Sequence, residues 1–264
     1  MKTLKSMVKS VPLLHKLALR TREKIESIPK SVPVLHRLVR RIRGEEPLGG
    51  FYSLSPDALV ALVRVFNIQQ SQLSSGRNLF EGHGYYEFGL FRGFSFWFAE
   101  QLSREYAGAS FRLFGFDSFE GLPQPQLDSE AAAFTKGDFC GSYETVTANL
   151  GRWKTDFSRI RLHKGFYSRQ LFEGLRQREE FPPISICLID VDLYESCIPV
   201  LDFIKDYLVA GSILLFDDYN QLGADDNSGE RRALIEFEQR NPEFRKEHLF
   251  DYGWEGVAFR VLSV

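Results

Sequence analysis

The amino-acid sequence predicts a doubly wound α/β fold built on a mostly parallel sheet. Strand-like runs alternate with helix-like stretches along most of the chain, which is the pattern of repeated strand–helix units. The run Ile184–Ile189 is almost continuously apolar, as expected for a strand that is buried on both faces of a parallel sheet. The last two strand-like segments, about 244–250 and 257–262, are close enough in sequence to form an antiparallel pair.

Each element follows from local signals. Residues 55–57 (Ser-Pro-Asp) are typical of a helix start, with an N-cap and a proline in the first turn, so we expect a helix to about Asn67. Segment 111–117 alternates and is rich in aromatic residues, which favours a strand. A long loop rich in Gly, Pro and acidic residues follows over about 118–140. The remaining expected strands are 85–89, 159–164 and 212–216, and the remaining expected helices are 93–106, 142–153, 168–178, 193–209 and 230–239.

Composition indicates an ordinary globular chain. Of the 264 residues, 44% are hydrophobic and 26% charged, which excludes disordered, collagen-like and coiled-coil chains. Apolar runs all fall well short of the roughly 20 residues that a membrane span needs. Three cysteines without CxxC spacing argue against a zinc site and for a reducing compartment, so we expect a cytoplasmic protein.

The N-terminal segment differs in charge from the rest of the chain. Residues 1–43 carry twelve Lys and Arg and two acidic residues, whereas the remainder carries 21 basic and 33 acidic residues. Segment 9–17 returns almost unchanged as 30–38, and each copy is typical of a short helix. We expect residues 1–46 to form a basic helical arm that packs on the domain 47–264 or on a second subunit. Weak contact with an anionic membrane surface is the alternative, and nucleic acid is not expected, because the acidic body would repel phosphate.

Glycines and an acid follow the first two expected strands, at the edge where doubly wound sheets bind ligands. Gly89 and Gly93 would let the backbone approach a ligand closely, or would serve only tight helix–strand packing. Their spacing is not GxGxxG, so the dinucleotide fingerprint is absent. Asp117, after the second strand, is placed to accept hydrogen bonds from both hydroxyls of a ribose, or to act as a plain turn residue.

Three carboxylates follow the fourth and fifth expected strands, namely Asp190, Asp217 and Asp218. Without a partner they would repel and raise one another's pKa, so a hard divalent cation such as magnesium, calcium or manganese is indicated. Asp192 and Glu195 fit a capping box for the next helix, which leaves Asp190 free for chemistry. Asp192 stays open as an alternative third ligand. The histidines do not organise a site.

Six segments occur in an order that resembles one known family. They are EFGLFRG (87–93), FDSFEGLP (116–123), KGDF (136–139), KGF (164–166), DVDLYES (190–196) and DDY (217–219). In this order they resemble the macrocin O-methyltransferase family, which methylates sugar hydroxyls of macrolide and aminocoumarin antibiotics. The resemblance covers about residues 85–237. The family is similar to class I S-adenosylmethionine (SAM) methyltransferases, which implies a seven-stranded sheet and a magnesium ion.

The resemblance implies a set of cofactor-binding residues. They are Glu87, Gly89, Asp117, Ser118, Phe119, Lys164, Gly165 and Phe166. The first two would line the methionine part of SAM, and the aspartate would hold the ribose with its two successors beside the ribose or adenine. The last three would lie at the adenine edge.

The resemblance also implies roles at the acidic end. Asp190, Asp217 and Asp218 would ligate Mg²⁺, with Asp190 also acting as general base. The loop between Pro123 and Gly137 would form a substrate lid, and the chain would be a homodimer. The segment after Tyr219 departs from the family pattern by being longer and more acidic, so the acceptor sugar does not follow from the resemblance.

The function implied is therefore SAM-dependent methylation of a hydroxyl, most simply one of a sugar. Two alternatives stay open: a metal-dependent methyltransferase of a catechol-like phenol, and an inactive protein that binds SAM or a nucleotide sugar. An NAD-dependent dehydrogenase is disfavoured by the missing glycine fingerprint.

Overall fold

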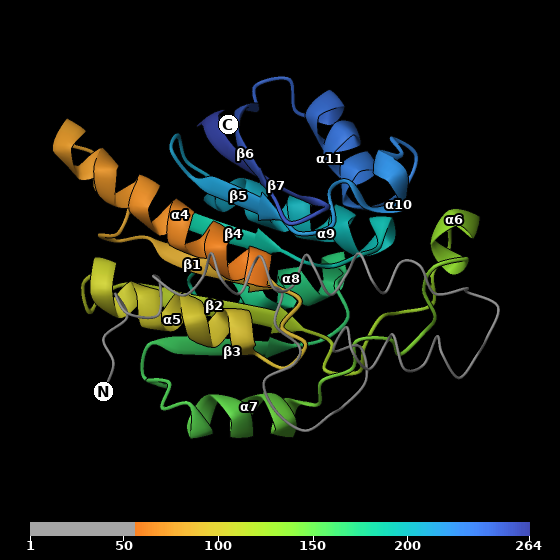
Figure 1. Ribbon diagram of the computed structural model, residues 1–264, viewed down its shortest axis with the longest axis horizontal. Helices are drawn as coiled ribbons and strands as arrows, with labels where there is room; N and C mark the ends of the chain where they lie inside the picture. Colours follow the sequence, from red (N-terminus) through yellow and green to blue (C-terminus); the bar gives the residue numbers. More distant parts are fainter. Residues whose placement is uncertain (1–55) are drawn as a thin grey trace.

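The computed structural model describes residues 56–264, so the expected N-terminal arm lies outside the described residues. Seven strands form one sheet in the order β3-β2-β1-β4-β5-β7-β6 (Figure 1). Their bounds are β1 (Gly84–Phe88), β2 (Arg112–Asp117), β3 (Ile160–Lys164), β4 (Ile184–Ile189), β5 (Ile213–Phe216), β6 (Arg245–Tyr252) and β7 (Gly256–Ser263). The first five pair in parallel, whereas β7 is antiparallel to both β5 and β6. This confirms the predicted fold class and the antiparallel final pair.

The register brings four strand ends to one edge of the sheet. Phe88 of β1 lies opposite Phe116 of β2 and Ile189 of β4, and Ile189 lies opposite Phe216 of β5. From β1 the strand order runs to β2 and β3 on one side and to β4 and β5 on the other, so the connections diverge between β1 and β4. Doubly wound sheets form a ligand crevice at such a point. The residues that end or follow these strands therefore meet there: Gly89, Asp117, Asp190 and Asp217.

Helices cover both faces of the sheet (Figure 1). On one face, α4 (Pro56–Gln72), α5 (Phe94–Tyr106) and α7 (Tyr143–Arg152) pack against side chains such as Tyr85 and Leu188. On the other face, α8 (Arg169–Arg176), α9 (Tyr194–Ile204) and α11 (Gly229–Arg240) pack against Tyr86 and Cys187. These two residues are the sequence neighbours of Tyr85 and Leu188 and point to the opposite face. This alternation buries both sides of the central strands, which explains their continuously apolar sequence.

The structure adds elements that the sequence did not predict. The first helix continues beyond Asn67 and ends in a 3-10 turn, η1 (Leu73–Ser75). A four-residue helix, α6 (Asp128–Ala131), interrupts the expected loop, and another, α10 (Gln221–Ala224), follows β5. The helix expected over 193–209 ends as α9 and passes into η2 (Lys205–Tyr207). Within residues 56–264, no helix has the length and apolar character to cross a membrane.

Candidate functional site

A cavity of about 580 Å³ opens at the carboxyl edge of the sheet. Its walls come from the strand ends, from the segment 118–126 with Phe139, and from residues 190–196 and 217–221. The predicted site residues that line it are Gly89, Asp117, Ser118, Phe166, Asp190, Asp217 and Asp218. The segment expected to form a substrate lid therefore does border the cavity.

Asp117 organises the end of the cavity that lies between β1 and β2. Its Oδ2 accepts hydrogen bonds from the backbone N–H groups of Leu90 (2.6 Å) and Phe91 (3.1 Å), and its Oδ1 accepts one from Phe119 (2.6 Å). Burial raises the pKa of Asp117, and these three hydrogen bonds oppose the rise. The carboxylate thus ties together the loops that follow the two strands.

Glycine is required at position 89 because the backbones that leave β1 and β4 approach each other closely there. It has φ +88°, and a Cβ at this position would lie 1.8 Å from the carbonyl oxygen of Asp190. No side chain can be accommodated there without moving the end of β4. The glycine predicted to approach a ligand therefore permits the close approach of two strand ends that both border the cavity.

Glu87 lies beneath the cavity rather than on its wall. It is fully buried, and its Oε1 accepts a hydrogen bond from Ser95 Oγ (2.6 Å), while its Oε2 accepts one from the Tyr85 hydroxyl. Burial raises the pKa of Glu87 to about 8, although both hydrogen bonds lower it. In this conformation the side chain supports the turn between β1 and α5.

Phe119, Lys164 and Gly165 also lie outside the cavity lining. The Phe119 ring is buried with its centroid 5.1 Å from that of Tyr143. Lys164 Nζ forms an ion pair with Glu120 (3.3 Å) at the surface. Of the adenine-edge residues predicted from the sequence, Phe166 is the one that borders the cavity.

Sequence reasoning missed several side chains of the cavity wall. Phe91, Phe139 and Tyr167 bring aromatic surface to it, and Gln221 brings an amide. Phe91 and Phe139 have φ angles of +47° and +57°, a backbone conformation that local sequence does not reveal. Tyr167 directly follows the predicted Phe166 and was the one that the sequence could have indicated.

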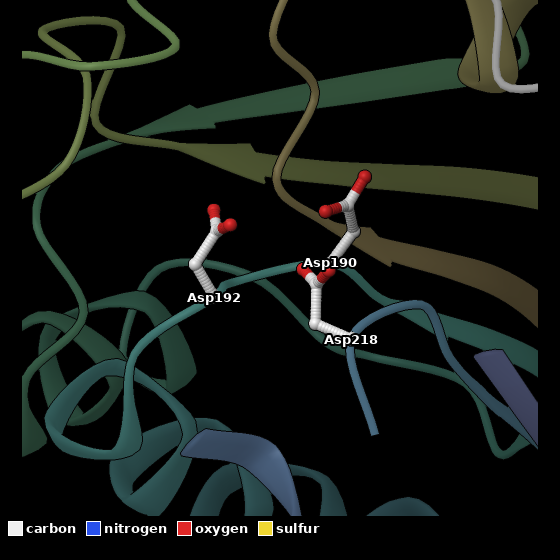
Figure 2. Close-up of side chains that lie close together, drawn as sticks. All are labelled: Asp190, Asp192 and Asp218. Carbon is white, nitrogen blue, oxygen red and sulfur yellow. The ribbon is translucent and has the colours of Figure 1, made fainter. Parts of the chain in front are cut away.

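Three carboxylates meet at the other end of the cavity. Figure 2 shows Asp190, Asp192 and Asp218, whose carboxylate oxygens lie within 4.8 Å of one another. The grouping differs from the predicted set, because Asp192 takes the place of Asp217. Asp217 lies outside this grouping; burial raises its pKa, and the neighbouring Tyr252 hydroxyl opposes the rise.

Burial and mutual repulsion raise the pKa values of these acids. Burial raises the pKa of Asp192 to about 7 and that of Asp217 to about 6. The pKa values of Asp190 and Asp218 are raised well above the usual range, first by burial and then by neighbouring carboxylates. A divalent cation would remove the repulsion, and an all-oxygen set is what Mg²⁺, Ca²⁺ or Mn²⁺ prefers.

Gln221 spans two members of the cluster. Its Nε2 donates to Asp218 Oδ1 (2.9 Å) and to Asp192 Oδ1 (3.5 Å). Its Oε1 is buried and has no hydrogen-bond partner among the described residues. This unpaired amide oxygen and the three carboxylates form a group of oxygen ligands. Such a group is expected where a hard cation is bound or where a bound hydroxyl donates a hydrogen bond.

The predicted capping role of Asp192 is wrong. The N-cap of α9 is Leu193, which makes no side-chain capping bond, and Asp192 has φ +58°. The first N–H of the helix, that of Tyr194, donates instead to Glu130 Oε1 (2.8 Å), a carboxylate of α6 that is distant in sequence. Because the cap is supplied from elsewhere, Asp192 is free to join the acidic cluster.

Comparisons with known proteins agree with this architecture. The model of a family described as macrocin-O-methyltransferase (TylF) matches residues 58–260. A curated relative from Streptomyces olivaceus, 8-demethyl-8-(2,3-dimethoxy-alpha-L-rhamnosyl)-tetracenomycin-C 4'-O-methyltransferase, is 28% identical over 139 residues. That alignment covers 50% of this chain and 51% of the relative, so the chain spans about half the length of the curated relative it matches.

Two solved structures share the fold. The O-methyltransferase NovP superposes with a TM-score of 0.61 at 17% identity, over 76% of this chain and 79% of NovP. The calicheamicin methyltransferase CalS11 superposes with a TM-score of 0.59 at 18% identity, over 98% of this chain and 94% of CalS11.

Proposed function

The chain belongs to the macrocin-O-methyltransferase family, and from this premise we propose that it transfers the methyl group of SAM to a hydroxyl of a sugar beside a bound Mg²⁺ ion. The observation that carries the proposal is the cavity itself. Its walls include Asp117 at one end and a cluster of carboxylates at the other. A cofactor and an activated acceptor need such neighbouring but chemically different sites.

The residues at the Asp117 end would bind and orient the cofactor. Asp117 is the proposed partner of the ribose hydroxyls, and Phe166 offers an aromatic face toward the adenine. Gly89 leaves room for the methionine part. Glu87, Ser118, Phe119, Lys164 and Gly165 complete the set proposed from the sequence, with Glu87 acting from beneath the turn.

The residues at the acidic end would hold the cation and the acceptor. Asp190 and Asp218 belong both to the set predicted from the sequence and to the observed cluster. The observed grouping favours Asp192 as the third ligand of the cation, whereas the sequence resemblance implies Asp217. When bound, the sulfonium of SAM supplies an electrophilic methyl group and Mg²⁺ lowers the pKa of a chelated hydroxyl.

Asp190 is the proposed general base, which accepts the proton of the acceptor hydroxyl on a carboxylate oxygen. It directly follows β4 and borders the cavity. Asp192 borders the same space and is the rival candidate on geometry. A base needs hydrogen-bond reach to the hydroxyl that it deprotonates, and both carboxylates border the cavity in which the acceptor would bind.

Calorimetric titration of SAM, followed by an assay of methyl transfer, tests the proposal. Wild-type protein is expected to bind SAM and to methylate a glycoside in the presence of Mg²⁺, with loss of transfer in chelator. Asp190→Asn is expected to bind SAM normally and to lose at least about 100-fold in transfer rate, in line with the contribution of a general base. Full transfer by Asp190→Asn together with a loss in Asp192→Asn would move the role of base to Asp192.

A phenolic acceptor is the second candidate, because aromatic side chains such as Phe91, Phe139 and Tyr167 line the cavity. A panel of matched glycosides and catechols separates the two acceptor classes. SAM binding without transfer to any acceptor of the panel would favour a binding protein over an enzyme.

The expected homodimer and the peripheral membrane contact are also proposals. The membrane contact is assigned to residues 1–46, whereas the dimer rests on both the family resemblance and this segment. Deletion of residues 1–43 is expected to change the oligomeric mass in solution and to abolish flotation with anionic vesicles. Unchanged mass and unchanged flotation would contradict these roles.

A further inference from the structure

The segment 118–140 is held against the cavity by a small apolar cluster and one buried carboxylate. Leu122 and Phe134 of this segment pack with Leu193, the residue before α9. Between them, Glu130 of α6 has no exposed surface, although the helix stands at the margin of the fold (Figure 1). A fully buried glutamate needs partners.

Glu130 finds its partners at two helix starts. Its Oε1 accepts hydrogen bonds from the N–H of Tyr194 (2.8 Å) and from the N–H of Gly229 (3.0 Å). These are the first residues of α9 and α11. A carboxylate at a helix N-terminus satisfies otherwise unpaired N–H groups and interacts favourably with the helix dipole.

These hydrogen bonds bracket Asp192. The N–H of Tyr194 on one side is held by Glu130, and the N–H of Val191 on the other is held by Glu230 Oε1 (3.1 Å). Asp192 itself has φ +58°, a conformation that costs free energy in a residue other than glycine and persists where its surroundings fix it. Two buried glutamates therefore fix the backbone that presents this carboxylate.

The same pair of glutamates reaches a second member of the cluster. Glu230 directly follows Gly229, whose N–H binds Glu130, and Glu230 Oε2 accepts a hydrogen bond from the N–H of Asp218 (3.2 Å). A displacement of Glu130 would therefore shift the backbone at both Asp192 and Asp218.

We infer that Glu130 is a positioning residue, which couples the cavity-bordering segment 118–140 to the carboxylates that bind the cation. The inference rests on the proposed function in its assignment of a cation to the Asp190, Asp192 and Asp218 cluster. Docking of the segment delivers the carboxylate that fixes the start of α9. Cation affinity and segment docking are then linked, so that each strengthens the other.

Binding of Mn²⁺, followed by electron paramagnetic resonance of the full chain, tests the coupling without an acceptor. Glu130→Ala is expected to weaken Mn²⁺ binding by about tenfold, the lower end of the effect of removing a partner behind metal ligands. SAM affinity is expected to stay unchanged, because Asp117 has its own backbone partners. A merely structural role would lower both affinities or neither.

Trypsin reports the docking of the segment directly. Lys136 is its one Lys or Arg between residues 118 and 140 and is exposed, so cleavage there gives fragments 1–136 and 137–264. Glu130→Ala is expected to be cut faster at this position, and Mn²⁺ is expected to slow the cut in the wild type more than in the variant.

Two variants serve as controls. Asp128→Asn removes the same charge from the same helix at an exposed position, and it is expected to leave Mn²⁺ affinity and cleavage unchanged. Glu130→Gln retains an oxygen that can accept both N–H groups, and it is expected to restore most of the Mn²⁺ affinity. Should Glu130→Ala not fold, Glu130→Asp, shortened by one methylene, is expected to show a smaller loss of the same kind.

Each outcome has a defined meaning. Equal Mn²⁺ affinity in Glu130→Ala and the wild type, whatever the cleavage rate, would overturn the coupling and leave the proposed function intact. An equal loss in Asp128→Asn would overturn it too, since charge alone would then explain the effect. A wild type that binds no Mn²⁺ but binds SAM would overturn the cation site and this inference with it.

Discussion

The two ends of the cavity are built in opposite ways. At the end near β1 and β2, which we call the cofactor end, one carboxylate, Asp117, is surrounded by three backbone N–H donors. At the end near β4 and β5, which we call the acid end, Asp190, Asp192 and Asp218 face one another. The cofactor end is electrostatically balanced by backbone N–H groups of the chain itself, whereas the carboxylates of the acid end repel one another unless the proposed cation is bound. Perturbing each end should therefore give different results.

Removal of Asp117 is expected to have the largest effect. Asp117→Ala loses the proposed ribose contacts and frees the N–H groups of Leu90, Phe91 and Phe119. Two lost hydrogen bonds to a charged group cost about 3 kcal/mol or more, so SAM affinity should fall by at least about 100-fold. Calorimetric titration of SAM and of S-adenosylhomocysteine measures this loss.

The same variant shows how independent the two ends are. Mn²⁺ affinity is expected to remain within about threefold of that of the wild type, because the acid end shares no hydrogen-bond partner with Asp117. Loss of both affinities in a folded protein would show that the cavity behaves as one unit and would break the comparison.

A cation is expected to stabilise the protein more at high pH than at low pH. Burial raises the folded-state pKa of Asp192 to about 7 and that of Asp217 to about 6, so the metal-free protein holds protons that the unfolded chain has already released. Stability contributed by these groups is present below about pH 4 and is lost as the pH rises through the folded-state values. The proposed Mg²⁺ would keep the carboxylates ionised by offsetting their mutual repulsion.

Thermal unfolding with and without 10 mM Mg²⁺ measures this effect. At saturation we expect the melting temperature to rise by about 5 °C at pH 8 and by less than about 1 °C at pH 5. The paired variants Asp192→Asn and Asp217→Asn then show which residue completes the ligand set, since the variant at the ligand position loses the shift. An equal shift at both pH values would contradict a site made of buried carboxylates.

The placement of Gly89 and Asp117 at one edge of the sheet was predictable from the sequence because that geometry is local. Asp117 ends β2, and its partners lie in the two loops that directly follow β1 and β2. Any parallel sheet with these strands as neighbours brings those loops together. The fold class and the positions of Gly89 and Asp117 follow from the same reasoning.

The acid end was less predictable because distant segments decide it. Asp192 resembles a helix cap in sequence, yet Glu130 of α6 supplies the cap from another part of the chain. Asp217 follows β5 as expected, but it lies outside the observed cluster, which Asp192 joins instead. Short distorted elements are equally hidden, since α10 contains Leu222 at φ +56°. Local propensity cannot report a tertiary partner.

The smallest expected effect concerns a histidine of β3 whose response to acid is opposite in sign to that of the acid end. His163 of β3 stacks on Phe116 of β2, with ring centroids 4.8 Å apart, and lies outside the lining of the cavity. Burial lowers its folded-state pKa to about 4, with Arg161 contributing, whereas the unfolded value is about 6.5. The stability that neutral His163 contributes is therefore complete above pH 6.5 and is lost as the pH falls toward 4, opposite to the acid end.

His163→Phe keeps the stacked ring and removes the titration. We expect the free energy of unfolding of the wild type to fall relative to that of the variant by about 2 kcal/mol between pH 6.5 and pH 4, allowing for partial relaxation of the site and for the Glu179 carboxylate 3.2 Å from His163 Nε2. Urea unfolding at closely spaced pH values, in the absence of divalent cations, gives the difference curve. Because both proteins carry the same acid end, its contribution cancels in the difference. A flat difference curve would mean that His163 gains a proton as easily in the folded protein as in the unfolded chain, which would contradict a pKa lowered by burial.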